Sequence, residues 1–230
     1  IAKKYNVDAI ISEECDIAMP TIAYVAEKMG LPSLGIRCAA LYTNKFLMRE
    51  FSSQLNLPYV DYKLCKTPKD VEVFFDELKC NIIIKPLDSN SSHGVFKITA
   101  KEQIHEKFDE TISFSKVEKV VLAERYIEGT EFTIDGLKTT EGHVTLAISE
   151  KRHYKHNINI ANELFFSHYN DRFDYDELRR VNDAFVNYSK LPYGTLTHAE
   201  YKYKDGKYYL IEIGARGGGN LISAVIVPLM

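Results

Sequence analysis

The order of predicted elements in this 230-residue sequence indicates a short α/β segment followed by a larger α+β region. Three observations support this class. A β-branched apolar run precedes a helical pattern near the start, two amphipathic helices alternate with strands in the middle, and strands dominate after residue 120. With 45% hydrophobic and 27% charged residues, the composition is that of an ordinary globular protein with a sizeable core.

The first segment is predicted to contain a strand and two helices. Residues 7–12 form an apolar run that predicts a buried strand. Residues 20–28 carry apolar side chains at helical spacing, and Gly30 suits the end of that helix because glycine accepts a left-handed conformation. A strand followed by a helix favours part of a parallel α/β sheet. A second helix is predicted at 44–55, with Thr43 as its N-cap.

The middle of the chain is predicted to form an antiparallel sheet with two helices. One helix begins at Thr67-Pro68, where proline fits the first helical position, and the other covers residues 101–113. The predicted strands cover residues 60–64, 81–87 and 95–99.

The last part is predicted to be mostly strand, with one helix at 174–189. Residues 152–170 are polar, histidine-rich and aperiodic, which predicts a loop. Lys204-Asp205-Gly206 is a hairpin turn signal between the last two strands. The predicted strands cover residues 120–126, 131–138, 144–151, 195–203 and 208–213.

Charge and composition exclude several classes of protein. A formal net charge of -3 argues against nucleic-acid binding, which usually needs a basic face. The longest apolar runs, 7–11 and 223–230, are too short to span a bilayer. No signal peptide is visible, and the four cysteines lack any CxxC pairing, so we expect reduced thiols in the cytoplasm rather than a zinc site or disulfides. Because the chain begins without methionine and stops without a closing element, we expect a piece of a longer protein.

A lysine at the end of an apolar strand is the first chemical signal. Burying Lys85 is costly unless an anion meets it. The loop that follows contains Ser91, Ser92, His93 and Gly94, whose backbone N–H groups could face phosphate oxygens. A plain polar hairpin with a lysine at a strand end explains this segment alone at least as well.

A charged segment after the next strand is the second signal. Glu124, Arg125, Tyr126 and Ile127 form a linker whose backbone could bind adenine while the Glu124 carboxylate takes the exocyclic amine. Glu131, seven residues further on, could accept from ribose hydroxyls. A solvated charged turn explains the segment equally well.

Two acids on the final hairpin are the third signal. Glu200 and Glu212 lie on adjacent predicted strands, and carboxylates on one sheet face repel unless a cation lies between them. Magnesium prefers such oxygen ligands, although an outward-facing acid is the alternative for either residue. Arg216 precedes three glycines, where a guanidinium can approach a transferred phosphoryl group.

Together with Lys45 at a helix start, these motifs resemble the ATP-grasp superfamily, including carboxylate–amine ligases, biotin carboxylase and the carbamoyl phosphate synthetase large subunit. The resemblance covers nearly the whole chain. It implies two α+β subdomains that clasp ATP, at 43–123 with the phosphate flap and at 124–230 with the metal site, the second truncated at its end. Residues 1–42 then resemble part of a Rossmann-like N-terminal domain of the biotin carboxylase type.

The resemblance also implies a role for each residue of the site. Lys45 and Lys85 become the phosphate lysines, and Arg216 the arginine that stabilises an acyl phosphate. The flap falls on Ser91, Ser92, His93 and Gly94, the adenine hinge on Glu124 and the backbone of Arg125, Tyr126 and Ile127, the ribose acid on Glu131, and the metal acids on Glu200 and Glu212.

Some residues depart from the family pattern or lie outside it. Gly214 replaces the asparagine that usually follows the last metal acid, so either Glu212 bridges the metals with water or metal binding is weakened. Asn90 replaces a common flap glycine, which implies a stiffer flap. Lys151 could reach the γ-phosphate or be a solvated residue. The acids Glu13, Glu14 and Asp16 either face the acceptor site or form a solvated loop.

The implied reaction is a ligation. ATP and Mg²⁺, with Mn²⁺ as an alternative metal, phosphorylate a small-molecule carboxylate, and an amine or ammonia attacks the acyl phosphate. Two other functions stay open: a bicarbonate-activating enzyme of the carboxylase or carbamoyl phosphate synthetase type, and a non-catalytic ATP-binding regulatory module, which Gly214 favours. No nucleic-acid or membrane partner is expected, and a homodimer is left open.

Overall fold

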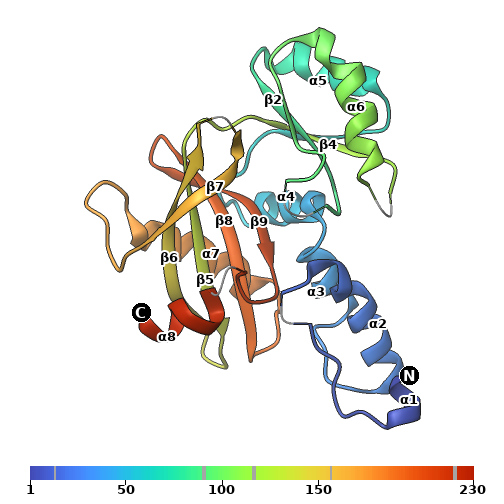
Figure 1. The fold of residues 1–230 in the computed structure, drawn as a ribbon, viewed down its shortest axis with the longest axis vertical. Helices are drawn as coiled ribbons and strands as arrows, with labels where there is room; N and C mark the ends of the chain where they lie inside the picture. The colour runs from blue at the N-terminus through green and yellow to red at the C-terminus, as the bar shows by residue number, and fades with distance from the viewer. Residues whose placement is uncertain (13, 90–91, 116–117, 156, 220–221) are drawn as a thin grey trace.

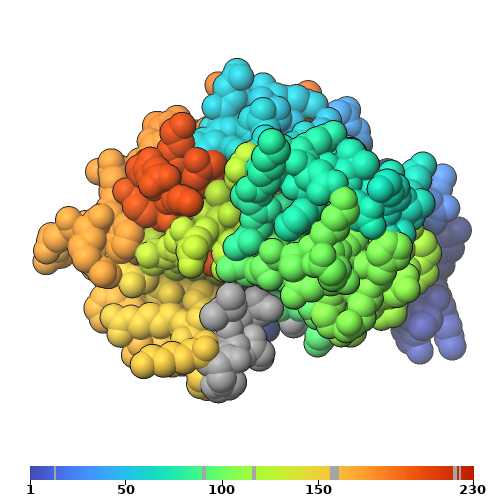
Figure 2. All heavy atoms as spheres, turned by 90° about the horizontal axis from the view of Figure 1, so that it is seen from above, coloured from blue at the N-terminus to red at the C-terminus, as the bar shows by residue number. Residues whose placement is uncertain are grey.

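The computed structural model describes residues 1–230 except 13, 90–91, 116–117, 156 and 220–221; side chains of 157–160 and 223 are also not described. The chain forms two antiparallel sheets, each with its own helices, and a helical N-terminal segment beside the second sheet (Figure 1). Seen from above, the teal and green atoms of the first sheet and its helices lie beside the yellow-to-red atoms of the second sheet (Figure 2). Among the described residues, no helix is both long and apolar enough to cross a bilayer.

The first sheet has the strand order β1-β4-β2-β3, with antiparallel neighbours throughout. Helices α5 (Pro68–Leu78) and α6 (Ile104–Ser113) pack on each other and on this sheet, and the short η2 (Lys101–Gln103) precedes α6. Thr67 and Asp70 form a capping box at the start of α5. The strands are β1 (Tyr62–Cys65), β2 (Ile82–Pro86), β3 (Phe96–Ile98) and β4 (Val121–Arg125).

The second sheet has the order β7-β6-β5-β8-β9, also antiparallel. Helix α7 (Tyr175–Tyr188), capped by Asp174, packs on it around the buried rings of Phe132, Phe185 and Tyr201. The strands are β5 (Thr130–Lys138), β6 (His143–Tyr154), β7 (Asn157–Phe166), β8 (Thr195–Lys204) and β9 (Lys207–Gly214); η3 (Ile222–Ile226) and α8 (Val227–Leu229) follow.

The N-terminal segment leads into a helix that joins the two sheets. It contains α1 (Ala2–Tyr5), η1 (Asp16–Ala18), α2 (Met19–Met29) and α3 (Ile36–Leu41). Helix α4 (Lys45–Gln54) then packs against β9, and its Arg49 side chain reaches both β4 and β9. Because α4 contacts both sheets, residues on this helix lie at the junction between them.

The α+β class, the antiparallel central sheet, the helices and the final hairpin are confirmed. The predicted turn is correct: Asp205 and Gly206 both have positive φ between β8 and β9. Gly30 ends α2 in a left-handed conformation, as predicted. The predicted subdomain boundaries stay predictions.

Three local predictions are wrong. Residues 7–12 form no strand, because a strand needs a hydrogen-bonded neighbour and no described strand pairs with them. Residues 152–166 are mostly strand rather than loop, and only 167–170 lie outside strands as predicted: β6 continues to Tyr154 and β7 covers Asn157–Phe166, but register shifts at His153 disturb the alternation that would reveal strands. The N-cap of α4 is Asn44 rather than Thr43, since the Asn44 side chain accepts from the N–H groups of Phe46 and Leu47.

Candidate functional site

A cavity of about 840 Å³ between the two sheets collects most of the predicted site residues. This is within the size range of small-molecule and cofactor sites. Lys45 lines an adjoining cavity instead, His93 and Gly94 lie outside the lining, and Ser91 lies outside the described residues. The predicted residues that line the cavity are Lys85, Ser92, Glu124, Arg125, Tyr126, Ile127, Glu131, Lys151, Glu200, Glu212 and Arg216.

Lys85 lies buried at the base of this cavity in an ion-pair cluster. Its Nζ lies 2.7 Å from Glu124 Oε2, and the Arg49 Nε lies 2.8 Å from Glu124 Oε1. Burial lowers the pKa of Lys85 to about 8, although the Glu124 carboxylate opposes this shift. In this structure both Glu124 oxygens therefore bind cations, and the carboxylate holds Lys85 in place.

Lysines also neutralise the acids predicted to bind metal. Lys45 Nζ lies 2.9 Å from Glu212 Oε2 and donates to the Ser89 carbonyl. Lys151 Nζ lies 2.5 Å from Glu200 Oε1 and 2.9 Å from Glu131 Oε1. Although burial alone would raise the pKa of Glu212, Lys45 and other nearby cations hold it well below its usual range. Glu212 is thus ionised, and the acids are paired with lysine side chains that an anion could attract away.

Glu200 and Glu212 fit the requirements of a magnesium ion. They are directly opposed residues of β8 and β9. Like charges in this arrangement repel, so a cation between them is stabilising. Magnesium is usually held by one or two carboxylates together with substrate phosphates and water. Within the described ranges, no group of three or more His, Cys, Asp or Glu side chains is arranged to hold a metal ion.

Arg216 is fixed by a carboxylate from the far end of the chain. Its Nε donates to Asp16 Oδ1 at 2.9 Å, its Nη2 to Asp16 Oδ2 at 2.7 Å, and its Nη1 to the Gly217 carbonyl. These hydrogen bonds use three of the N–H donors of the guanidinium, so it can bind an anion through the others. Bidentate pairing restricts the orientation of Arg216.

Gly214 makes room for this ion pair. A Cβ at this position would lie 2.7 Å from Asp16 Oδ1 and 3.1 Å from Arg216 Cγ. Any larger side chain would therefore displace the Asp16 carboxylate. The departure from the expected asparagine has a steric reason: the Asp16 carboxylate occupies the space beside the backbone that an asparagine side chain would enter.

The hinge and residues His93 and Gly94 of the loop after Lys85 contact neighbouring segments in different ways. The N–H groups of Arg125 and Tyr126 donate to the carbonyls of Asp61 and Asn81, which fixes the hinge against neighbouring segments. Lys97 Nζ lies 4.0 Å from the centre of the Tyr126 ring. In the loop, the His93 ring stacks on Phe114, and Gly94 has φ +72° with no space for a Cβ beside Phe114 and Pro86.

Sequence reasoning missed several residues of this site. Arg49 lies in an amphipathic helix with no motif around it, yet it is 1% exposed and binds Glu124. Lys202 lies 3.4 Å from Glu131, and His198 lies 2.8 Å from Asp135 and beside Glu200. The sequence indicates Asp16 only as a solvated acid or a residue of the acceptor site, and does not reveal its pairing with Arg216. Alternation along β8 was the available signal, because it places residues 198, 200 and 202 on one face.

A family model described as an ATP-grasp domain matches residues 78–224. The chain is 26% identical over 112 residues to a D-alanine–D-alanine ligase of Haemophilus ducreyi, covering 47% of this chain and 36% of that protein. Among solved structures it is similar to an L-amino acid ligase from Bacillus licheniformis, with TM-score 0.80, 23% identity, and coverage of 98% of this chain and 53% of that one. It is also similar to a biotin carboxylase–βγ-ATP complex from Campylobacter jejuni, with TM-score 0.78, 12% identity, and coverage of 99% and 54%.

These matches show what the chain shares with larger proteins. The chain spans about a third of the length of the curated ligase it matches and about half of the two solved chains. At identities below 25%, the two structures establish a common fold.

Proposed function

Because the chain belongs to the ATP-grasp family, we propose that it is the nucleotide-binding part of an ATP-dependent carboxylate–amine ligase. The observation that carries the proposal is the convergence on one cavity of buried cations, paired acids and a fixed arginine. Similarity to ligases that join amino acids supports the reaction class.

The two chemical steps need no side-chain nucleophile. First, a substrate carboxylate oxygen bonds to the γ-phosphorus of ATP while the bond to the bridging oxygen breaks, and ADP leaves with that electron pair. Second, an amine nitrogen bonds to the acyl carbon, the bond to the phosphate oxygen breaks, and the amine loses a proton. Catalysis of such steps is mostly positioning and charge stabilisation.

The residues of the candidate site each have a role in this proposal. Lys85 and Lys45 bind phosphate oxygens, and Lys151 leaves Glu200 to reach the γ-phosphate. The hinge from Glu124 to Ile127 receives adenine, Glu131 lies toward the ribose, and Ser92 lies toward the phosphates. Arg216, oriented by Asp16, stabilises the acyl phosphate. Glu200 and Glu212 would hold Mg²⁺ or Mn²⁺, which supplies charge neutralisation at the phosphates.

The proposal is tested by calorimetric titration of ATP with and without Mg²⁺. We expect metal-dependent binding that Glu212→Gln abolishes, because the amide removes the charge that pairs with Lys45 and the metal. Glu163→Gln is the matched control, since Glu163 lies in an exposed ion pair with Arg152 and outside the cavity lining. Equal binding by both variants, or no binding by the intact full-length protein, contradicts the proposal.

Turnover assays then separate the reaction classes. ADP release that depends on an organic carboxylate and an amine supports the ligase. Release that depends on bicarbonate supports the bicarbonate-activating alternative, and metal-dependent binding without release supports the regulatory module.

The proposal also predicts that nucleotide affinity falls as the pH rises. With a pKa of about 8, Lys85 is charged at pH 7 and neutral at pH 9. The charged fraction falls about tenfold across this range, so we expect ADP affinity to fall by up to about tenfold. Titration of Mg-ADP at pH 7, 8 and 9 measures this. A Lys85→Met variant should bind more weakly at pH 7 and lose this pH dependence; an unchanged slope in the variant would assign the effect to another group.

A further inference from the structure

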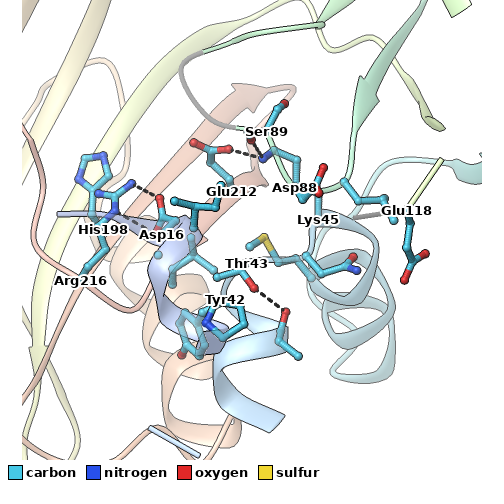
Figure 3. Close-up of a pocket in the computed structure, with 18 of the residues that line it drawn as sticks. Asp16, Tyr42, Thr43, Lys45, Asp88, Ser89, Glu118, His198, Glu212 and Arg216 are labelled. Carbon is cyan, nitrogen blue, oxygen red and sulfur yellow. Dashed lines mark hydrogen bonds and ion pairs between the residues drawn. The ribbon is translucent and has the colours of Figure 1, made fainter. Parts of the chain in front are cut away.

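A second cavity of about 320 Å³ adjoins the first and has a different character. The two cavities share Asp16, His198, Glu212 and Arg216, so they meet where the phosphoryl group would be transferred. Figure 3 shows the paired Arg216 and Asp16 toward one side of the second cavity and Glu118 toward the other, with Glu212, Lys45 and Asp88 between them.

Apolar side chains form much of the wall between these ends. They come from the η1–α2 segment, α3, α4 and β9, and include Ile17, Pro20, Ile36, Ala40, Met48 and Ile213. The larger cavity is lined by lysines, acids and the hinge as well as by apolar side chains, so it is the more polar of the two. A charged group placed against the apolar wall would lose hydration without a partner, so this wall favours an uncharged, apolar group.

The shared end of the cavity offers a site for an anion. There Arg216 donates to Asp16 and Gly217 and keeps further N–H donors for an anion. Elsewhere the lining contains both Lys45 and Asp88, so the apolar wall, rather than charge, disfavours a second negative group on the substrate. The polarity therefore orients an amphiphilic acid with its carboxylate at Arg216 and its tail against the apolar wall.

We propose that this cavity binds the side chain of the carboxylate substrate, and that the substrate is a small monocarboxylic acid with a compact apolar tail. The inference rests on the proposed function and adds the specificity of the acceptor. The carboxylate lies at the junction of the cavities, within reach of the γ-phosphate, while a branched aliphatic or single aromatic side chain fills the space beside Ala40 and Met48. Dicarboxylic acids of similar size are poor substrates because their second carboxylate would lose hydration against the apolar wall.

The test uses the full-length protein with Mg-ATP and a series of monocarboxylic acids graded by apolar side-chain size, with matched dicarboxylic acids. ADP release gives kcat/KM for each acid. Ala40→Leu narrows the cavity, and Ile36→Ala, at a half-exposed position, widens it. Ala100→Phe is the control for added volume, because Ala100 is exposed and lies outside the lining.

We expect Ala40→Leu to lower the kcat/KM ratio of the largest to the smallest acid by about tenfold or more, because a single methylene changes such ratios by roughly 10- to 200-fold. Ile36→Ala should shift the ratio the other way, and Ala100→Phe should leave it unchanged. If the ranking of acids is the same in every variant, or if dicarboxylic acids match the monocarboxylic acids, the inference is wrong while the ligase remains. If ATP binds but no organic acid releases ADP, both the ligase and the inference are wrong.

A binding measurement gives a readout that does not depend on turnover. In the presence of Mg-ADP, the midpoint of thermal unfolding should rise with the same acids that are good substrates, by mass action on the folded state. Ala40→Leu should abolish the shift for the largest acids only. A shift that follows carboxylate charge but not side-chain size would overturn the assignment of the cavity.

Discussion

Replacing Arg216 with alanine is expected to lower carboxylate-dependent ADP release by about 10²- to 10³-fold while ATP still binds. This is the usual loss when one preorganised donor to a developing oxyanion is removed. Arg216 suits this role because Asp16 fixes its orientation: the guanidinium already donates three hydrogen bonds, two to Asp16 and one to the Gly217 carbonyl. Its contribution should therefore be seen in kcat more than in the KM for ATP.

Two comparison variants make this expectation specific. Arg216→Lys keeps the charge but cannot form the two-pronged pair with Asp16, so we expect it to recover only part of the rate. Arg179→Ala is the matched control, because Arg179 pairs with the exposed Asp176 on α7. A loss in ATP affinity that equals the loss in kcat/KM, with kcat unchanged, would assign Arg216 to ground-state binding instead.

The candidate site could be predicted from sequence where its residues lie on strands with a clear local pattern. Lys85 follows three isoleucines, and Glu200 and Glu212 follow the alternation of a hairpin with a clear turn, so local pattern placed each of them. The structure brings these residues to one cavity.

Partners that come from distant elements could not be predicted in this way. Arg49 and Glu124 are 75 residues apart, and Asp16 and Arg216 are 200 apart. A helix pattern shows that one face of α4 is buried, but not that Arg49 is the charged residue on that face. Similarly, the sequence shows only that Gly214 lacks the side chain of a metal ligand. The structure shows that the Asp16 carboxylate lies beside it.

The strand β7 shows a different limit of sequence reasoning. Its pairing with β6 is interrupted by register shifts around His153, so neighbouring residues do not alternate regularly between two faces. The backbone still forms the ladder because cross-strand hydrogen bonds, rather than side-chain pattern, satisfy its polar groups. The converse holds for residues 7–12, where the pattern is apolar but no described strand offers a ladder.

Gly214→Asn is expected to disrupt the site by moving Asp16 and Arg216. The backbone at Gly214 is not left-handed, so an asparagine is allowed there and the obstacle is the short contact to Asp16 Oδ1. We expect a loss of about 1–3 kcal/mol in unfolding free energy, the usual cost of overpacking a buried position. Turnover should fall about as far as in Arg216→Ala, because the bidentate pair can no longer form.

The double variant Asp16→Ala/Gly214→Asn separates the steric role of Gly214 from the role of Asp16. Removing the Asp16 carboxylate removes the clash, so the stability lost in Gly214→Asn should return and the two effects should not add. Turnover should stay low, because Arg216 then lacks the carboxylate that orients it.

Denaturant unfolding measures stability and Mn²⁺ titration in the presence of ADP measures metal binding, and both are independent of turnover. Additive losses would mean that Gly214 is not required for the ion pair. Full recovery of turnover would mean that an asparagine here replaces what Asp16 provides, so that the glycine and the distant aspartate together do the work of the family's usual residue.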